Sequence, residues 1–187
     1  MVNITNLSND ILRLIRAYIE DDHFLDISTK LYYEKKYIRY ISLKRNKSIK
    51  YYFDENYRRQ ILTLIDNPGK QLSLYLCCCN IKDVSPLANI HALNLSGCHE
   101  IKDVSSLANI YSLNLTDCRK IRDVSKLRNV HMLNLSYTNI RDVSMLGNVE
   151  KLYLSYCNKI NDISALGNVR TLYLNGCRRI KDVSIYI

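Results

Sequence analysis

Cysteines recur at a regular distance along the second half of the chain. The column consists of Cys79, Cys98, Cys118, Cys157 and Cys177, and Thr138 stands at the one place where a cysteine is missing. Thiolates could bind zinc, but zinc sites use CxxC pairs or nearby histidines, and neither accompanies these cysteines in register. We therefore expect a structural role for the thiols and no bound metal.

Aspartates form a second column with the same period. Its members are Asp83, Asp103, Asp123, Asp142, Asp162 and Asp182, and each precedes a Val-Ser or Ile-Ser pair. A ladder of carboxylates could bind calcium. The alternative, which we favour, is that each aspartate accepts hydrogen bonds from backbone N–H groups in its own turn.

The histidines do not form a catalytic group. The four are His23, His91, His99 and His131. His91 and His131 occupy the same repeat position, with Tyr111 as their equivalent. No Ser/His/Asp set, glycine-rich phosphate loop or paired carboxylate motif appears. The sequence therefore predicts a protein that is not an enzyme and uses no cofactor.

These columns follow from an internal repeat that begins at Leu74. The units are LYLCCCNIKDVSPLANIHA (74–92), LNLSGCHEIKDVSSLANIYS (93–112), LNLTDCRKIRDVSKLRNVHM (113–132), LNLSYTNIRDVSMLGNVEK (133–151), LYLSYCNKINDISALGNVRT (152–171) and the partial LYLNGCRRIKDVSIYI (172–187). Each LxL places two leucines on one face of a short strand. Since one such strand cannot bury its apolar face alone, the units must stack on one another.

The units resemble the leucine-rich repeat, whose signature is LxxLxLxx(N/C)xL. In the fifth unit the matching residues are Val149, Leu152, Leu154, Cys157 and Ile160, and the DVSxLxNV segment resembles the short repeats of internalin-like proteins. The resemblance implies an α/β fold, a right-handed solenoid with parallel strands on a concave face and short turns or 3-10 segments on a convex face. It also implies a protein–protein interaction module that binds through the concave face.

The candidate binding residues are the outward positions of the expected strands. They are Tyr75, Asn94, Asn114, Asn134, Lys151, Tyr153 and Tyr173. Three of them form a column of asparagines, for which we expect a stacked amide ladder. Tyrosine is a frequent anchor of protein interfaces.

The N-terminal segment resembles the start of an F-box. The match rests on the helical spacing of the apolar residues, and it includes Asp10 and Ile27. The candidate adaptor-binding residues are Leu7, Ile11, Leu12, Ile15, Ile19, Phe24 and Leu25. Ser8 replaces the usual proline, and the chain has no tryptophan. The resemblance implies a substrate receptor of a cullin-type ubiquitin ligase, with a Skp-type adaptor and an unknown target as protein partners.

Two alternatives remain for the N-terminal part. In the first, the chain is a plain repeat scaffold whose helical head only caps the solenoid. In the second, the segment 30–59 binds RNA, because basic residues and tyrosines alternate along it. The competing interpretation of this segment is a solvated helical surface with tyrosines packed beneath it.

The sequence divides into three parts. We expect an F-box-like helical domain over 1–50, a helical cap over 51–71 and the repeats over 72–187, with a helix at 54–66 that Asp54 caps. No apolar run is long enough to span a membrane, and no secretory signal is evident. Seven cysteines, an odd number, then predict free thiols and a cytoplasmic location. The combination also resembles repeat proteins of giant DNA viruses.

Overall fold

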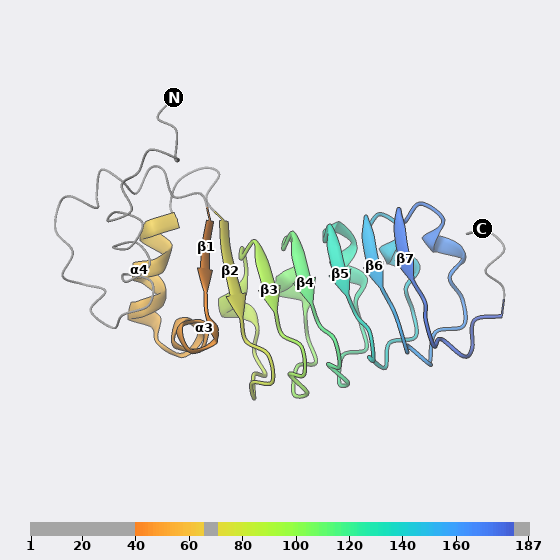
Figure 1. Ribbon diagram of the computed structural model, residues 1–187, viewed down its shortest axis with the longest axis horizontal. Helices are drawn as coiled ribbons and strands as arrows, with labels where there is room; N and C mark the ends of the chain where they lie inside the picture. Colours follow the sequence, from red (N-terminus) through yellow and green to blue (C-terminus); the bar gives the residue numbers. More distant parts are fainter. Residues whose placement is uncertain (1–39, 66–70, 182–187) are drawn as a thin grey trace, which may run out of the picture.

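The structure, a computed structural model, describes residues 40–65 and 71–181. All F-box-like residues, from Leu7 to Ile27, lie outside these ranges. The described part forms one parallel sheet with strand order β1-β2-β3-β4-β5-β6-β7, and the strands stand side by side in chain order (Figure 1). This is the α/β leucine-rich-repeat solenoid that the sequence predicts.

The seven strands are short. Their bounds are β1 Tyr40–Leu43, β2 Gln71–Tyr75, β3 Ala92–Asn94, β4 Ser112–Asn114, β5 Met132–Asn134, β6 Lys151–Tyr153 and β7 Thr171–Tyr173. The strands of the repeats are in register, so that Leu93 pairs with Leu113 and Leu113 with Leu133. The hydrogen bonding continues past each strand end, as when Leu95 N–H donates to the Asn114 carbonyl at 2.9 Å. Each LxL therefore lies within the ladder, and most strands begin one residue before its first leucine.

A 3-10 turn returns the chain from each strand to the next. The turns are η3 Ser85–Leu87, η4 Ser105–Leu107, η5 Ser125–Asn129, η6 Ser144–Leu146 and η7 Ser164–Leu166. The N-cap of η3 is Val84, and Asp83 Oδ1 accepts the Ser85 N–H at 2.8 Å.

The aspartate column repeats this contact in every described unit. Asp103, Asp123, Asp142 and Asp162 accept the N–H of the serine two residues further on at 2.8–2.9 Å. These bonds lower the pKa of the carboxyls below the ordinary value, with the backbone bond as the main cause. The carboxylates thus serve their own turns, as expected, which disfavours the calcium alternative.

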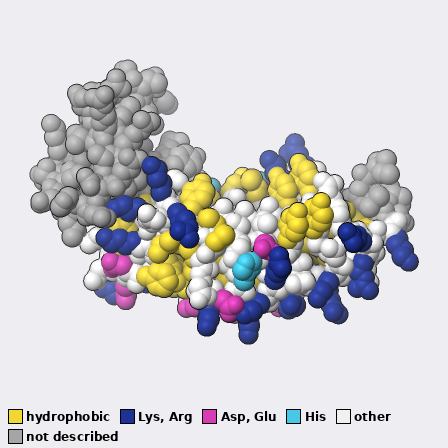
Figure 2. Space-filling view, turned by 60° about the horizontal axis from the view of Figure 1, so that its bottom comes forward, with side chains coloured by type: hydrophobic (Ala, Val, Ile, Leu, Met, Phe, Trp, Pro, Cys, Tyr) yellow, Lys and Arg dark blue, Asp and Glu magenta, His cyan; other side chains and the backbone are white. Residues whose placement is uncertain are grey.

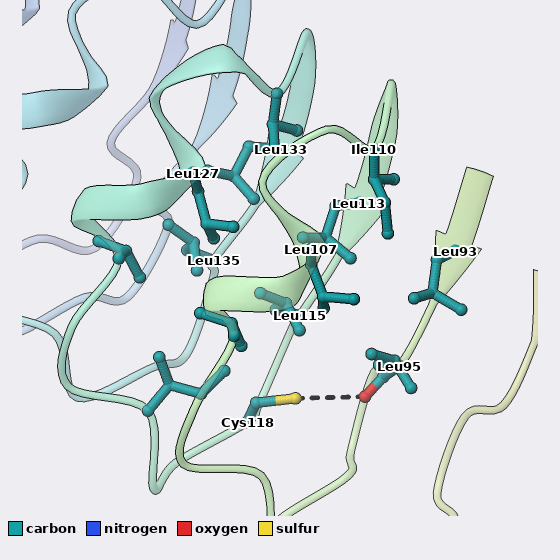
Figure 3. Packing of buried hydrophobic residues seen from close by; sticks show 14 of the residues in the cluster. Leu93, Leu95, Leu107, Ile110, Leu113, Leu115, Cys118, Leu127, Leu133 and Leu135 are labelled. Atoms are coloured by element: carbon teal, nitrogen blue, oxygen red, sulfur yellow. Dashed lines mark hydrogen bonds between the residues drawn. The ribbon is translucent and has the colours of Figure 1, made fainter. Parts of the chain in front are cut away.

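The core is a stack of leucine, isoleucine and valine layers between strands and 3-10 turns. In the central units Leu113 and Leu115 point from the strand side toward Leu107 and Leu127 of the turns (Figure 3). All four are at most 1% exposed. Burying one such side chain stabilises the fold by about 1.5–3 kcal/mol, and each layer covers its neighbours.

Two helices and one strand cover the first repeat. Strand β1 is followed by α3 (Arg45–Phe53) and α4 (Glu55–Ile65), which stand at one end of the row of strands (Figure 1). Tyr57 N–H donates to Asp54 Oδ1 at 2.9 Å, which confirms Asp54 as the cap of α4. The expected boundary at 50/51 falls inside α3, and β1 extends the sheet into the part expected to be helical.

Candidate binding surface

The outward positions of the strands form one continuous face, called here the strand face. In each three-residue strand from β3 to β6 the central leucine is buried and its two neighbours are partly exposed. All the candidate residues predicted for the concave face lie there. Lys151 begins β6, and a column in register contains Tyr75, Asn94, Asn114, Asn134, Tyr153 and Tyr173.

The asparagines of this column bond within their own units. The Oδ1 atoms of Asn94, Asn114 and Asn134 each accept the N–H of the residue two positions further on at 3.0 Å. Thr116 Oγ1 also donates to Asn114 Oδ1 at 2.7 Å. The amide oxygens therefore hold the turns that follow the strands. The stacked amide ladder expected from the sequence is replaced by three local turn contacts.

Two tyrosines stack on the strand face next to the asparagines. The ring centroids of Tyr153 and Tyr173 are 4.5 Å apart, and the ring planes differ by 3°. Tyr173 is 41% exposed. The register of β6 and β7 places both rings at equivalent positions of adjacent units, so the stack follows directly from the repeat.

A second tyrosine pair lies in the turns that follow β5 and β6. Tyr137 and Tyr156 stack with centroids 4.6 Å apart and planes within 12°. They are 50% and 46% exposed. Figure 2 shows hydrophobic side chains gathered on this edge of the sheet, over the C-terminal repeats. We call this pair, Tyr137 and Tyr156, the tyrosine edge.

The tyrosine edge occupies a position that favours glycine. Tyr137 and Tyr156 have φ of 61° and 60°. The equivalent residues Gly97 and Gly176 have φ of 71° and 73°, and the equivalent Cys78 and Asp117 have φ of 56° and 61°. A side chain in this left-handed region costs roughly 1 kcal/mol or more relative to glycine. The stacking of the two rings contributes about 0.5–1.5 kcal/mol, which offsets part of this strain. Strain and stacking are of similar size, so the backbone conformation alone does not select tyrosine at this position.

Sequence reasoning did not select the tyrosine edge. The signal was nevertheless present, because the column that contains both tyrosines also contains two of the five glycines. A glycine recurring at one repeat position indicates a positive φ, and a bulky residue at the same position is unusual.

A third aromatic row lies at the opposite edge, where the strands begin. The Tyr111 ring stacks between His91 at 4.8 Å and His131 at 4.4 Å. His131 Nε2 contacts Oε2 of Glu150, and Oε1 of the same carboxylate lies 3.5 Å from Arg170 Nη1. Burial lowers the pKa of His91. This row packs adjacent repeats against each other, and no nucleophilic side chain of the row lies beside its two histidines.

The cysteine column donates hydrogen bonds to the preceding unit. Cys118 Sγ lies 3.2 Å from the Leu95 carbonyl oxygen (Figure 3), and Cys98 and Cys157 make the same contact at 3.1 Å. Burial raises the pKa of Cys98 to about 11 and that of Cys118 to about 12. Protonated thiols are neither nucleophiles nor metal ligands at neutral pH. The geometry therefore supports the structural role expected for them.

Tyr51, Tyr52 and Tyr57 of the basic segment 30–59 pack against the core. Tyr51 and Tyr57 are at most 4% exposed, and the Tyr52 hydroxyl donates to the Asp83 carbonyl oxygen at 2.6 Å. Arg58 Nη1 donates to the carbonyls of Tyr51 and Tyr52 and so closes the end of α3. These side chains join the helical cap to the first repeat, which supports the packing interpretation and disfavours the RNA alternative.

Over residues 40–65 and 71–181, no group of three or more His, Cys, Asp or Glu side chains is arranged to hold a metal ion. Within the same ranges no helix has the length and apolar composition needed to cross a membrane.

Comparison with known proteins gives similarity at the level of repeat structure. No protein-family model matches the chain, and no curated protein matches it in sequence. Among solved structures, internalin C2 of Listeria monocytogenes is 29% identical over 62% of this chain and 65% of its own, with a TM-score of 0.42. Internalin F of the same species is 25% identical over 88% and 54%, with a TM-score of 0.46.

A third similar structure is the functional domain of InlJ from Listeria monocytogenes, described as including a cysteine ladder. It is 18% identical over 62% of this chain and 27% of its own, with a TM-score of 0.37. The chain thus spans less than two thirds of each of these structures. Its own parallel sheet, leucine layers and 3-10 turns define it as a leucine-rich-repeat solenoid with a small helical cap.

Proposed function

We propose that this chain is a protein-binding scaffold whose partner docks on the strand face. The observation that supports this most directly is the column in register that ends in the Tyr153–Tyr173 stack, because it combines aromatic and amide side chains on one face of the sheet, with Lys151 at the start of β6 beside it. Tyrosine is a frequent anchor of protein interfaces. The thiols and aspartates of the repeat columns are engaged in hydrogen bonds of the repeat itself, as Cys118 and Asp123 show.

The finer proposal is a substrate receptor of a cullin-type ubiquitin ligase. Residues 40–65 already cover the first repeat, with Leu43, Tyr51 and Ile61 each 1% exposed. Residues 40–65 thus contribute a cap of their own at this end of the core, which supports a separate use of the F-box-like residues for a Skp-type adaptor. This role would place the protein in the cytoplasm, where free thiols persist.

Co-precipitation of the full chain with a purified Skp adaptor tests the finer proposal. The wild type should bind, and the double change Ile11→Ala and Ile15→Ala should abolish binding while the melting temperature stays near the parent value. A mutant that binds the adaptor like the wild type would contradict the F-box assignment. If the double variant instead melts at a lower temperature than the wild type, and the wild type does not bind the adaptor, the N-terminal head only caps the solenoid.

Proximity labelling in cells tests the broader proposal. The double change Tyr153→Ser and Tyr173→Ser should remove a defined set of protein partners, because it deletes the aromatic stack and leaves the leucine layers intact. Tyr111→Ser, at the opposite edge, is the matched control and should retain those partners. If the partner set is the same for all three proteins, the strand face is not the binding surface.

A further inference from the structure

The tyrosine edge offers a second, more specific surface beside the strand face. We propose that Tyr137 and Tyr156 bind an acidic, extended segment of the protein partner. The inference rests on the proposed function. It places the binding surface at the tyrosine edge of the fourth to sixth repeats and gives the partner segment an acidic composition.

The faces of the Tyr156 ring are both covered, which bears on the kind of partner. Tyr137 stacks on one face at 4.6 Å. The backbone of Gly176 lies beneath the ring, since a Cβ at that position would come within 2.6 Å of Tyr156 Cδ1. A nucleic acid base needs an open ring face on which to stack. What Tyr156 presents to a ligand is its ring edge and hydroxyl, a combination that suits a polypeptide with apolar and hydrogen-bonding groups.

The surrounding charge favours an acidic partner. Residues 133–181 contain seven Lys and Arg against three Asp and Glu. Asp142 and Asp162 accept hydrogen bonds in their own turns, and Glu150 lies between His131 and Arg170. Asp117, at the position equivalent to Tyr137 in the preceding unit, is paired with Arg119 at 2.6 Å.

The basic side chains of the same units are not neutralised in this way. Among the residues that the structure describes, no carboxylate lies within ion-pair distance of Lys151, Lys159, Arg178 or Arg179. In Figure 2, Lys and Arg side chains lie on several sides of the hydrophobic group on this edge, and acidic and His side chains also lie at its border. A segment rich in Asp and Glu complements this charge and would be steered toward it.

The backbone at these positions supplies an independent argument. Gly97, Gly176, Cys78 and Asp117 adopt the same left-handed turn, so folding does not require an aromatic residue at 137 and 156. Bulky residues held in a strained region and exposed to solvent are typical of binding sites. Tyr156 also lies only three residues from Tyr153, so that a bound segment can pass from the edge onto the strand face.

Selection of random dodecapeptides on the immobilised full chain tests the inference. Enriched peptides should carry an excess of Asp and Glu, and their affinity should fall as salt rises. The double change Tyr137→Gly and Tyr156→Gly should weaken their binding about tenfold or more. Because glycine suits the left-handed turn, this variant should keep the cooperative melt of the parent. Tyr111→Ala, an exposed stacked tyrosine at the opposite edge, should bind the peptides like the parent.

Several results would overturn the inference. These are a selection that yields no binders, enriched peptides without an acidic excess, or unchanged binding by the double variant. Tighter binding of an oligouridine that is lost in the same variant would assign the edge to nucleic acid instead. If the peptides lose affinity only for the Tyr153→Ser and Tyr173→Ser variant, the edge assignment fails and the strand face of the proposed function stands.

Discussion

The hydroxyl of Ser48 accepts the N–H of Tyr75 at 2.9 Å, and donates to the Leu43 carbonyl oxygen at 2.8 Å. Strand β1 ends at Leu43, opposite Leu74, so the next amide of β2 has no strand beside it. Ser48, which is fully buried on α3, takes the place of the missing backbone acceptor. The Ser48 hydroxyl on α3 therefore continues the hydrogen bonding of the sheet beyond the end of β1.

Replacing this serine should destabilise the whole described array from its N-terminal end. Ser48→Ala leaves a part-buried N–H and a buried carbonyl without this partner, which costs about 1–3 kcal/mol. The expected drop in melting temperature is roughly 2–10 °C for a chain of this size. Ser42→Ala on β1, where the side chain is exposed, is the control and should melt like the parent. Equal melting of both variants would show that water or a neighbouring group replaces the hydroxyl without loss.

The leucine layers predict a much larger effect in the central repeat. Leu135 is 0% exposed, and Leu135→Asp would bury an unpaired carboxylate. Since each unit covers its neighbours, most of the array should lose its cooperative melt as followed by circular dichroism. Leu135→Ala should retain the transition but lose about 2–5 kcal/mol of unfolding free energy. A Leu135→Asp protein that melts like the parent would place this leucine outside the core.

The aspartate column predicts acid sensitivity. The hydrogen bonds from Ser125 lower the pKa of Asp123 from its ordinary value of 3.8. The stabilising contribution of this carboxylate is therefore present above about pH 4 and is lost as the pH falls through the lowered pKa. Asp123→Ala should unfold more readily in urea than the parent at pH 7, and the two curves should converge as the pH falls below 4.

Asp123→Asn is the matched control, because its amide keeps an Oδ1 acceptor and does not titrate in this range. The urea unfolding curve of Asp123→Asn should lie closer to that of the parent at pH 7. Its turn should lose no hydrogen-bond acceptor when the pH falls. A gap between parent and Asp123→Ala that stays constant from pH 7 to pH 3 would contradict the assigned titration.

The repeat core was predictable because its signals are local and redundant. The two leucines of each LxL and the Asp-Val-Ser turn recur in register, so one correct unit gives the next. The helical cap was harder, since β1 has no repeat signature and pairs with residues about thirty positions later. Side-chain partners were harder still. The Asn94 amide could have bonded along the column, and only the backbone geometry shows that it bonds to Ser96.

The thiols should divide into two groups by reactivity. Cys98, Cys118 and Cys157 are 0% exposed, and burial raises the pKa of each. Because the thiolate is the reactive form, these three should resist alkylation by iodoacetamide at pH 7.5 in the native protein. Cys78 is exposed and should react first. Peptide mass mapping after a short native pulse, followed by a second label in urea, distinguishes the two groups.

The substitution at Thr138 provides the comparison within the column. Its Oγ1 donates to the Leu135 carbonyl of its own unit at 2.6 Å and lies 3.5 Å from Cys157 Sγ. A cysteine at 138 should adopt the buried environment of Cys118 and remain unlabelled in the native pulse. Both Thr138→Cys and the parent should then carry the same native label, and the variant should gain one label only in urea. Rapid native labelling of Cys118 or of the introduced thiol would show that the column opens to solvent, which a continuously packed solenoid does not allow.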